Sequence, residues 1–483
     1  MGLVTPVDPV PLSELGRVHF VGIGGAGMSG IARIMLARGI EVSGSDAAAS
    51  PGLDELAALG ARVAVGHAAG NLGDLSAADT LVVSSAIRPD NPELTEARRR
   101  GLRVLHRAGA LASEMLGAGA GIAVAGTHGK TTTTSMITTV LRHCGADPSY
   151  VIGGILAETG LGADQGSGSV FVAEADESDG SFLMLAPDTA VVTCVEADHL
   201  DNYADLAQIE ETFLAFTGKI SPGGLLVACA DDPGARKLAG QVAAGDRPPG
   251  VLTYGTAPDA DYRVSDVHPD GMATTLTITG GPGTRAEGPT RVRIAVPGRH
   301  NALNAAAAFA VTAELGCAPD AIAAGLARYG GARRRMELKG EADGVRVVDS
   351  YAHHPTELAA DLAAARDIAA GGRVIALFQP HLFSRTRIFA AEFGAALSQA
   401  DEVLVLDIYA AREDPEPGVT GQLICDAVPG ERAQFLPDRA SAPAVVAGLA
   451  KPGDLVLTMG AGDVTALGPL IVAVLHERAG EAG

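Results

Sequence analysis

Residues 126–131 read Gly-Thr-His-Gly-Lys-Thr, a short segment that contains two glycines and ends in a lysine and a threonine. The apolar run 122–125 before it is typical of a strand, and the residues after it predict a helix that continues to about Cys144. Backbone N–H groups of such a turn and the positive end of the helix bind phosphate oxygens. Lys130 can add a positive charge, and Thr131 a hydroxyl ligand for Mg²⁺. The segment therefore predicts a nucleoside triphosphate site, with a bare glycine-rich turn as the alternative.

Two later apolar runs, at 170–174 and 190–195, end in carboxylates and an imidazole. Hard oxygen ligands, such as these carboxylates, suit Mg²⁺. We expect the ends of these neighbouring strands to hold the ion between nucleotide and substrate, with Glu174 and His199 as ligands. A solvated acidic loop is the alternative. The charged residues of the two clusters are Glu174, Asp176, Glu177, Asp179, Asp198, His199 and Asp201.

A second glycine-rich turn, Gly-Ile-Gly-Gly-Ala-Gly at 22–27, follows the apolar run 18–21, and Asp46 ends the next predicted strand. This arrangement matches the dinucleotide fingerprint, in which the turn binds a pyrophosphate. Taken alone, it favours an NAD-dependent oxidoreductase. The same turn binds any diphosphate, however, and an oxidoreductase leaves the loop at 126–131 unexplained. A nucleoside-diphosphate substrate is therefore the competing interpretation.

Polar side chains in three later segments have the chemistry to contact a ligand. A predicted Ala-rich helix carries His300 and Asn304 one turn apart with Asn301 beside them, and such groups contact a purine edge or cap the helix. Segments 349–355 and 379–387 each follow an apolar run and bring histidines and arginines to what we expect to be adjacent strand ends. Guanidinium and imidazole groups there fit a small carboxylate, with surface loops as the alternative.

The elements that must position these groups form three α/β units. A length of 483 residues predicts about three domains at roughly 150 residues each. Strand-like runs alternate with Ala-rich helical stretches in the first and last parts, which predicts Rossmann-like domains with parallel sheets. Alternating residues at 250–297 predict antiparallel strands, and hence a mixed sheet in a central P-loop-type ATPase domain. We therefore expect domains at 1–112, 113–330 and 331–483.

Composition excludes several classes of protein. A net charge of −21 would repel a nucleic-acid backbone, and 47% apolar with 19% charged residues fits a globular chain. No apolar run reaches the roughly 18 residues that span a bilayer, and the N-terminus lacks the pattern of a secretion signal. Five cysteines without C-x-x-C spacing argue against a disulfide framework and a zinc ribbon. We expect a cytoplasmic protein with no nucleic-acid binding and no membrane insertion.

Eight motifs resemble, in the same order, those of the Mur ligases of bacterial cell-wall synthesis, and their alanine-adding branch in particular. They occupy residues 19–32, 126–135, 174–182, 198–203, 299–308, 332–337, 349–358 and 378–387. By this resemblance, the first domain should bind the UDP part of a sugar nucleotide and the middle domain ATP. The third domain should contact the far side of the nucleotide and the amino acid.

The resemblance implies an ATP-dependent ligase that forms an amide bond. ATP would phosphorylate the lactyl carboxylate of UDP-N-acetylmuramate, and the amine of L-alanine would attack the acyl phosphate through a tetrahedral intermediate. The products would be UDP-N-acetylmuramoyl-L-alanine, ADP and phosphate, in peptidoglycan synthesis. The implied cofactors are ATP and Mg²⁺, the implied partners are UDP-N-acetylmuramate and L-alanine, and both a monomer and a homodimer stay open.

The family motifs also assign roles to residues of this chain, with Thr131 and Glu174 at one metal ion and His199 at a second. The implied catalytic residues are Lys130, Glu174, His199 and Arg385. The implied ATP-binding residues are Gly126, Thr127, His128, Gly129, Lys130, Thr131, Thr132, His300, Asn301, Asn304, Arg334, Arg335 and Asp349. The implied substrate-binding residues are Gly22, Gly24, Gly25, Ala26, Gly27, Met28, Ser45, Asp46, Ser84, Ser85, Tyr351, His353, His381 and Arg385.

The chain departs from the family pattern at specific positions. Ser350 stands where related chains usually have a second aspartate, and Leu382 where many have an arginine, so no contact from that arginine is expected. Other Mur ligases use a carbamylated lysine after the Asp-His segment, but no lysine occurs between His199 and Lys219, in agreement with the alanine-adding branch. A recycling ligase that attaches a ready-made tripeptide is disfavoured, because it has Cys-Gly-Thr-Phe where residues 25–28 read Gly-Ala-Gly-Met.

Overall fold

The computed structural model describes residues 3–200, 202–411 and 413–481. The chain divides into two compact units, each built from helices and sheets. The first unit comprises Met1–Ser265, Thr277–Val292 and Leu303–Tyr329. The second comprises Asp266–Leu276, Arg293–Ala302 and Gly330–Gly483. The two nucleotide loops predicted at 22–27 and 126–131 both belong to the first unit.

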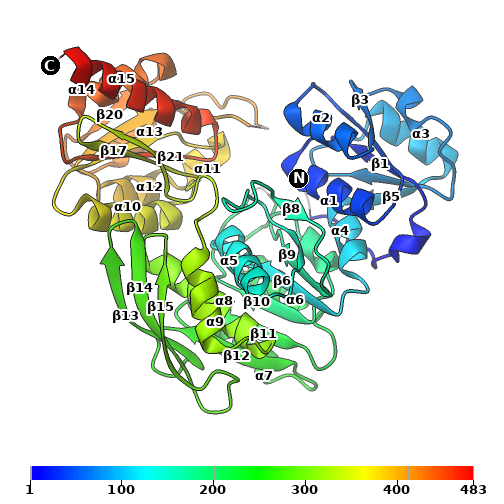
Figure 1. Cartoon of the computed structure of the whole chain (residues 1–483). Coiled ribbons are helices and arrows are strands. Elements are labelled where there is room, and N and C mark those ends of the chain that lie inside the picture. The colour runs from blue at the N-terminus through cyan, green and yellow to red at the C-terminus, as the bar shows by residue number, and fades with distance from the viewer. Residues whose placement is uncertain (1–2, 201, 412, 482–483) are drawn as a thin grey trace. The chain divides into compact units, whose positions relative to one another are not determined.

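The first sheet contains five parallel strands in the order β3-β2-β1-β4-β5. Figure 1 labels β1, β3 and β5 of this sheet. Its strands are β1 (Val18–Val21), β2 (Val42–Asp46), β3 (Arg62–Val65), β4 (Thr80–Val83) and β5 (Arg103–His106). Its helices are α1 (Ala26–Ala37), α2 (Pro51–Ala58), α3 (Pro92–Arg100) and α4 (Arg107–Met115). The strand order reverses between β1 and β4, and ligands of such sheets bind at this switch point. The turn at 22–27 follows β1 and lies there.

Local sequence sets the helix boundaries around this sheet. The side chain of Asn91 accepts hydrogen bonds from the N–H groups of Glu93 (2.9 Å) and Leu94 (3.3 Å), and α3 begins directly after it. The helix ends at Gly101, whose φ of 72° lies in the left-handed region that glycine adopts without strain. In the same way, Ser50 caps α2.

The second sheet contains ten strands in the order β15-β14-β13-β12-β11-β10-β6-β9-β7-β8. Its strands are β6 (Ala120–Ala125), β7 (Ser149–Val151), β8 (Ala163–Asp164), β9 (Val170–Glu174), β10 (Thr189–Val192), β11 (Leu225–Cys229), β12 (Gly250–Gly255), β13 (Tyr262–Asp270), β14 (Ala273–Gly280) and β15 (Gly288–Ile294). The helices around it are α5 (Lys130–His143), α6 (Leu206–Thr217), α7 (Pro233–Ala243), α8 (Arg299–Glu314) and α9 (Pro319–Arg328).

This sheet is mixed, as the sequence predicts. Neighbouring strands are parallel along the run β12-β11-β10-β6-β9-β7. At the end of the sheet, β8 is antiparallel to β7. Only two residues connect β13 to its neighbour β14, and parallel strands need a crossover of about a dozen residues. The predicted antiparallel pairing near 250–297 therefore applies to this hairpin, but it is wrong for β12, which pairs in parallel with β11 and with β13.

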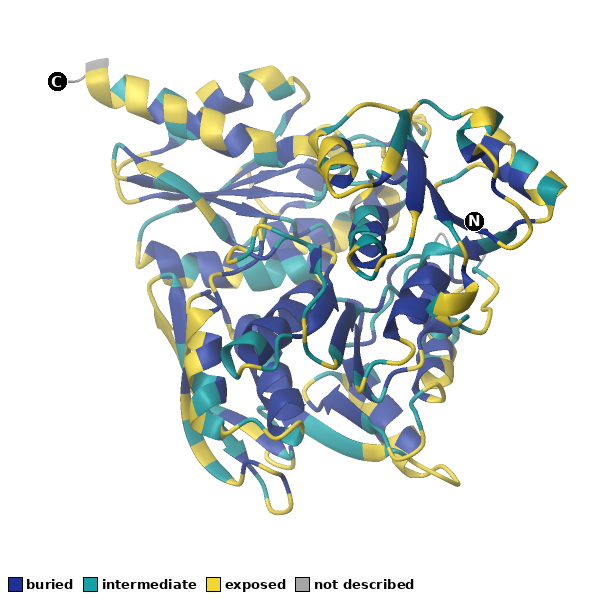
Figure 2. Cartoon of the chain, turned by 45° about the vertical axis from the view of Figure 1, so that its right-hand side comes forward, coloured by how far each residue is buried: buried dark blue, intermediate teal, exposed yellow. Residues whose placement is uncertain are grey.

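The third sheet, in the second unit, has the order β16-β17-β21-β18-β19-β20, parallel except for β16. Apolar side chains cover both of its faces, and its four central strands are coloured almost entirely as buried in Figure 2. Its strands are β16 (Glu337–Ala342), β17 (Val345–Ser350), β18 (Val374–Phe378), β19 (Glu402–Leu406), β20 (Ala433–Leu436) and β21 (Leu455–Met459). Its helices are α10 (Pro355–Ala369), α11 (Phe383–Ile388), α12 (Ala390–Leu397), α13 (Gln422–Ala427), α14 (Ala442–Leu449) and α15 (Leu467–Glu481).

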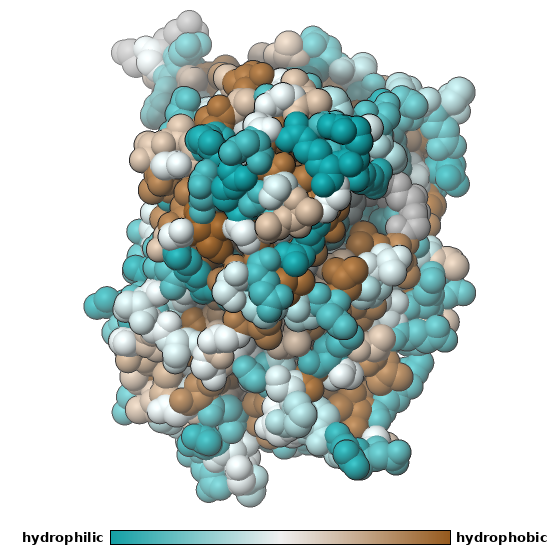
Figure 3. Space-filling view, turned by 90° about the vertical axis from the view of Figure 1, so that its right-hand side faces the viewer, coloured by the Kyte–Doolittle hydropathy of each residue, from teal (hydrophilic) through white to brown (hydrophobic). Residues whose placement is uncertain are grey.

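Short 3₁₀ helices occur at Leu12–Glu14, Ala69–Leu72, Ser181–Met184, Arg439–Ser441 and Asp463–Ala466. Within the described part of the chain, every helix is too short or too polar to cross a membrane. On the face drawn in Figure 3, hydrophilic and hydrophobic residues are interspersed.

Five strands were missed by the sequence analysis. Two of them, β7 and β8, have only three and two residues. The other three, β3, β16 and β20, lie at the edge of a sheet and carry half-buried or exposed residues. Their sequences therefore lack the continuous apolar run of a central parallel strand. The predicted domain edge near 112 falls within α4, and that near 330 falls between α9 and β16. The exact domain edges stay a prediction.

Candidate active site

The loop at 126–131 leads from β6 into α5, and its conformation requires glycine at two positions. Gly126 has a φ of 136°, and a Cβ there would lie 2.0 Å from Thr193 Oγ1. Gly129 has a φ of 81°, and a Cβ there would lie 2.7 Å from Asn304 Oδ1. Neither position accommodates a side chain, so both glycines are required by conformation and by space. The N–H of Thr127 donates to the Cys194 carbonyl at 3.0 Å, which ties the loop to the residues after β10.

Lys130, the first residue of α5, points back into its own loop. Its Nζ donates to the carbonyls of Gly126 (2.6 Å) and Thr127 (3.1 Å) and lies 2.7 Å from Glu177 Oε2. Burial would lower the pKa of Lys130, but the attraction of Glu177 and Asp176 outweighs it and raises the pKa above its ordinary value. The loop therefore holds a fully charged ammonium group beside its backbone.

Thr131 and Glu174, the residues predicted at one metal ion, are brought together. The Thr131 hydroxyl donates to Glu174 Oε1 at 3.1 Å, and the Gly153 N–H donates to Glu174 Oε2 at 2.7 Å. A Cβ at Gly153 would lie 2.7 Å from Glu174 Oε1, so a glycine is needed for this approach. A hydroxyl and a carboxylate side by side at the start of a phosphate-binding helix fit Mg²⁺ well.

His199, predicted at a second metal ion, lies on the other side of Lys130. Its Nε2 is 3.7 Å from Glu177 Oε1 and 3.6 Å from Asp198 Oδ2. The backbone of His199 has a φ of 53°, a strained value for this residue type that is common at functional sites. Glu177 thus links His199 to Lys130. Asp201 lies outside the described residues.

Asn304, predicted near adenine, contacts the same loop from α8. Its Oδ1 accepts a hydrogen bond from the Thr133 hydroxyl at 3.2 Å. Thr131 and Thr132 are buried in the first turn of α5. The interactions of Asn304 therefore include the phosphate loop and the helix that follows it.

Asp46, the acidic residue that ends β2, holds the first glycine-rich turn in place. The Gly24 N–H donates to Asp46 Oδ2 at 2.9 Å, and the Gly22 N–H donates to the Ser45 carbonyl at 2.8 Å. Gly22 has a φ of 81°. A Cβ on Gly27 would lie 3.1 Å from an Arg107 nitrogen, so this guanidinium sits against the turn.

Ser84 and Ser85 follow β4 at the same edge of the sheet. The Ser84 carbonyl accepts a bond from the Ile87 N–H at 3.0 Å. The Ser85 hydroxyl donates to Asp179 Oδ2 at 2.5 Å and lies 3.1 Å from His106 Nε2. The acidic segment after β9 therefore reaches the predicted sugar-nucleotide side as well as the phosphate loop.

In the second unit, aromatic and cationic side chains that were predicted to contact the amino acid and a phosphate group lie close together. The Arg334 and Arg335 guanidinium groups lie 4.7 Å and 5.2 Å from the centre of the Tyr351 ring. The His353 ring lies 5.2 Å from that of Tyr351 and 5.9 Å from that of His381. The residues after β17 and those after β18 are thus brought together.

Three further predicted residues of this unit, Asn301, Asp349 and Arg385, are buried. Asp349 is fully buried, and its two oxygens accept bonds from the hydroxyls of Thr458 (2.6 Å) and Thr465 (2.7 Å). The Asn301 amide donates to the Pro297 carbonyl at 2.7 Å, which is the helix-start role that the sequence left open for it. Arg385 is buried in α11.

His300 lies 3.5 Å from Asp361, measured between Nε2 and Oδ1. Burial lowers the pKa of His300, and the nearby carboxylate opposes that shift. A neutral imidazole at this position presents one donor and one acceptor nitrogen.

Three family models match successive segments of the chain. Residues 17–118 match the Mur ligase family catalytic domain, residues 124–312 the Mur ligase middle domain, and residues 334–462 the Mur ligase glutamate ligase domain. The chain belongs to the Mur ligase family. The expected α/β fold of three domains is confirmed by these matches and by the sheets described above.

Curated relatives of this Mur ligase match it over nearly its whole length. The UDP-N-acetylmuramate–L-alanine ligase of Thermobifida fusca is 60% identical, covering 98% of this chain and 100% of that protein. The enzyme of the same name from Kineococcus radiotolerans is 59% identical, covering 97% and 98%. The crystal structure of UDP-N-acetylmuramate-alanine ligase from Thermotoga maritima has a TM-score of 0.77 at 28% identity, covering 97% and 100%.

Two expectations about strand neighbours are wrong for this Mur ligase. β9 and β10 do not pair with each other, because β6 lies between them. In the third sheet, β21 lies between β17 and β18. Crossover connections let a later or earlier strand enter between two consecutive ones. The phosphate-loop strand β6 is therefore flanked by the two acidic strand ends, which places Glu174 and His199 on its two sides.

Sequence analysis missed a buried network that stabilises the first glycine-rich turn of the Mur ligase. Glu93 accepts bonds from the Ser45 hydroxyl (2.7 Å) and the Asn71 amide (2.6 Å), and His19 Nε2 lies 3.1 Å away. Burial would raise the pKa of Glu93, but hydrogen bonds from His19 and Ser45 outweigh it and hold the pKa below its ordinary value. Ser45, a predicted substrate contact, has its side chain in this network. No local pattern marks Glu93, because its partners lie on other elements.

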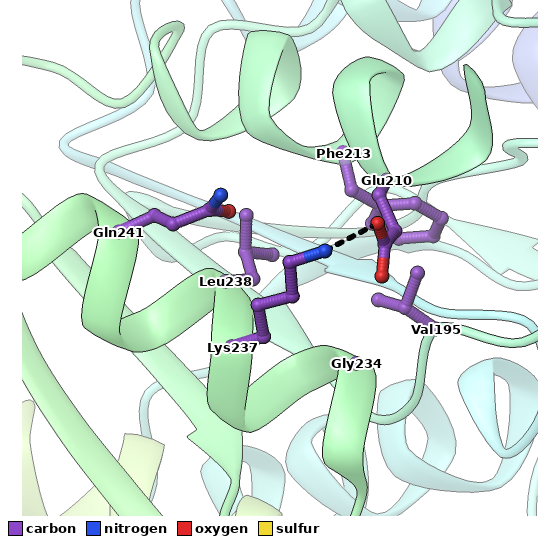
Figure 4. A pocket seen from close by; sticks show the side chains of 7 residues that line it. All are labelled: Val195, Glu210, Phe213, Gly234, Lys237, Leu238 and Gln241. Atoms are coloured by element: carbon purple, nitrogen blue, oxygen red, sulfur yellow. Dashed lines mark hydrogen bonds and ion pairs between the residues drawn. The ribbon is translucent and has the colours of Figure 1, made fainter. Parts of the chain in front are cut away.

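A shallow hollow between α6 and α7 contains none of the predicted site residues. Lys237 and Glu210 line it and form an ion pair of 2.6 Å (Figure 4). Phe213 and Leu238 supply apolar walls. This hollow offers no cluster of reactive groups, unlike the loop at 126–131.

Proposed function

We propose that this chain joins L-alanine to the lactyl carboxylate of UDP-N-acetylmuramate at the expense of ATP, giving UDP-N-acetylmuramoyl-L-alanine, ADP and phosphate. Two observations support this together. Relatives named for this reaction are 59–60% identical over nearly the whole chain. The loop at 126–131 presents a charged Lys130 beside Thr131 and Glu174, which suits phosphoryl transfer from ATP.

Lys130 is the residue that we propose to act on the transferred phosphoryl group. In phosphoryl transfer, catalysis is mostly positioning and electrostatic stabilisation. The backbone N–H groups of 126–131 would bind the phosphate oxygens, with Thr127, His128 and Thr132 among the contacts. Lys130 leaves the loop carbonyls and Glu177 to reach the β- and γ-phosphates. Its raised pKa keeps it charged throughout, so it stabilises negative charge rather than moving a proton.

Mg²⁺ fits the donor groups on both sides of Lys130. We assign Thr131 and Glu174 to one ion and His199 to a second. Their hydroxyl, carboxylate and imidazole groups converge on the start of α5 through the 3.1 Å Thr131–Glu174 contact and the Glu177 link to His199. Bound Mg²⁺ would neutralise charge on the phosphates and the acyl acceptor.

We assign the sugar nucleotide to the switch point of the first sheet. The diphosphate would bind the N–H groups at the start of α1, where a helix N-terminus attracts an anion. Asp46 keeps the turn in its conformation through the Gly24 N–H. The assigned residues are Gly22, Gly24, Gly25, Ala26, Gly27, Met28, Ser45, Asp46, Ser84 and Ser85.

The remaining assignments concern L-alanine and the adenine, ribose and phosphate groups of ATP. Arginine and histidine side chains suit the carboxylate of alanine. We assign Tyr351, His353, His381 and Arg385 to L-alanine, with Arg385 also counted as catalytic. We assign His300, Asn301 and Asn304 to adenine, Asp349 to the ribose, and Arg334 and Arg335 to phosphate. The domains are assigned to 1–112, 113–330 and 331–483.

We also place the protein in the cytoplasm, with no nucleic-acid partner. All five cysteines are free thiols, which is usual in a reducing compartment. The charge of −21 disfavours binding to nucleic acid.

A substrate-omission assay tests the proposal. Purified protein with ATP, Mg²⁺, UDP-N-acetylmuramate and L-alanine should release phosphate and form the amide, detected by mass spectrometry, only when all four are present. Phosphate release that is independent of the sugar nucleotide contradicts the proposal. Replacing L-alanine by the tripeptide of the recycling ligase should give no product. Product from the tripeptide and none from L-alanine would assign the chain to that ligase instead.

A further inference from the structure

Asp176 lies two residues beyond Glu174 and has no role in the mechanism above. Its Oδ2 accepts a bond from Arg107 at 2.5 Å, and its Oδ1 accepts one from the Ser178 N–H at 3.1 Å. The side chains of Arg107 and Asp176 are 24% and 35% exposed. The ion pair is therefore accessible to a ligand while still partly shielded from water.

Arg107 faces the first glycine-rich turn as well as Asp176. One of its terminal nitrogens would lie 3.1 Å from a Cβ at Gly27, in the first turn of α1. The N-terminus of that helix attracts anions. A guanidinium group binds phosphate and carboxylate through the same donors. A diphosphate at this turn and the Asp176 carboxylate would therefore draw on the same cation.

Asp176 is also attracted by the cation of the other nucleotide loop. Burial would raise the pKa of Asp176, but the attraction of Arg107 and Lys130 outweighs it, so the pKa lies below its ordinary value. Lys130 in turn is attracted first by Glu177 and then by Asp176. Asp176 is also the direct neighbour in sequence of Glu177, whose Oε2 lies 2.7 Å from Lys130 Nζ. It therefore lies between Lys130 of the phosphate loop and Arg107, which begins α4 and lies against the first glycine-rich turn.

We propose that Asp176 is a positioning residue that competes with the sugar-nucleotide diphosphate for Arg107 and thereby couples the occupancy of the two nucleotide loops. The inference rests on the proposed function, which puts the diphosphate at residues 22–27. A diphosphate that binds Arg107 leaves Asp176 to interact with Lys130, which makes Lys130 harder to draw toward ATP. ATP phosphates that bind Lys130 leave Asp176 to hold Arg107 more strongly. The coupling is reciprocal by linkage.

Calorimetric titration of UDP into the full chain tests this inference. Asp176→Asn should bind UDP about fivefold more tightly than the wild type, because Arg107 is released from an ion pair. The gain should be larger with a nonhydrolysable ATP analogue and Mg²⁺ present than without them. Asp176→Glu keeps the charge and should stay close to the wild type. In turnover assays, Asp176→Asn should lower the KM for UDP-N-acetylmuramate and leave the KM for L-alanine unchanged.

The controls separate a loss of charge from a loss of fold. Asp246→Asn removes one exposed carboxylate elsewhere in the same unit and should leave UDP affinity unchanged. Arg107→Gln removes the shared cation and should weaken UDP binding at least about fivefold and abolish its dependence on the ATP analogue. This variant gives an independent test if Asp176→Asn does not fold.

Unchanged or weaker UDP binding by folded Asp176→Asn overturns the inference, as does an Arg107→Gln protein whose UDP affinity still depends on the analogue. If the wild type binds UDP and passes the omission assay, either result leaves the proposed function standing. A wild type that does not bind UDP overturns both.

Discussion

Replacing Lys130 by methionine should both destabilise the protein and abolish turnover. Lys130 Nζ lies 2.7 Å from Glu177 Oε2, and the Glu177 side chain is 3% exposed. Removing one partner of a buried ion pair costs about 3–5 kcal/mol. The melting midpoint should therefore fall on the order of 10 °C. Turnover should fall at least about 10³-fold, because the phosphate loop loses its cation.

A double variant separates the two effects. Lys130→Met with Glu177→Gln removes both charges, so no buried carboxylate is left without a cation. We expect the double variant to recover about 2 kcal/mol relative to Lys130→Met, while its turnover stays lost. Lys237→Met is the matched control, because Lys237 is 53% exposed in its pair with Glu210 and should contribute less than about 1 kcal/mol.

The pH dependence gives a further check on the same pair. Burial raises the pKa of Glu177, and Lys130 and His199 oppose that shift. Without Lys130 the pKa rises further, so the folded protein binds more protons than the unfolded chain above the ordinary pKa of glutamate. Its stability therefore falls as the pH rises through that window. Thermal melts at pH 5.5 and 8.5 should show the larger loss at pH 8.5. Equal midpoints for the single and double variants at the higher pH would refute the reasoning.

Three other predictions concern the metal site, the loop and acid stability. Thr131→Val should raise the Mg²⁺ concentration needed for half-maximal phosphate release at least about tenfold, with an unchanged melting midpoint. Gly126→Ala should abolish binding of an ATP analogue in calorimetry, since its Cβ would lie 2.0 Å from a hydroxyl oxygen. Gly39→Ala, with φ 80° and no atom within 4 Å, should cost only about 1 kcal/mol and bind normally. Burial would raise the pKa of Asp79, but hydrogen bonds from Arg17 outweigh it and lower the pKa to about 2. Wild-type stability should therefore drop by roughly 1 kcal/mol, after solvent screening, as the pH falls from about 4 to 2, and Asp79→Asn should lack this drop.

The central strands and both glycine-rich loops were predictable because their signals are local. A continuous apolar run, a tight turn and a helix start lie within about fifteen residues of one another at 122–135. Edge strands such as β3 gave no such signal, since their residues are half-exposed. Strand order was not predictable either, because the crossover that inserts β6 between β9 and β10 depends on packing between distant segments.

The sequence predicted which residues belong to the candidate site, but not which of their side chains contact each other. Glu174 and Glu177 are three residues apart in one acidic segment, and the sequence predicted Glu174 as a metal ligand but assigned no partner to Glu177. The fold distinguishes them, because Glu174 contacts the Thr131 hydroxyl whereas Glu177 contacts the Lys130 ammonium. Glu93 had no signal at all, since its partners come from β1, β2 and the turn at 69–72.

The segment 174–179 has a geometric reason to serve both nucleotide loops. β9 lies next to β6, so the residues after β9 emerge beside the phosphate loop that follows β6. The same residues reach the start of α4, where Asp176 meets Arg107, and the end of β4, where Asp179 accepts the Ser85 hydroxyl. In the proposed coupling, Asp176 pairs with Arg107 beside the first loop, and its neighbour Glu177 pairs with Lys130 of the second loop. A ligand that draws either cation away therefore changes the charge balance of the segment, and with it the affinity of the other loop for its phosphates.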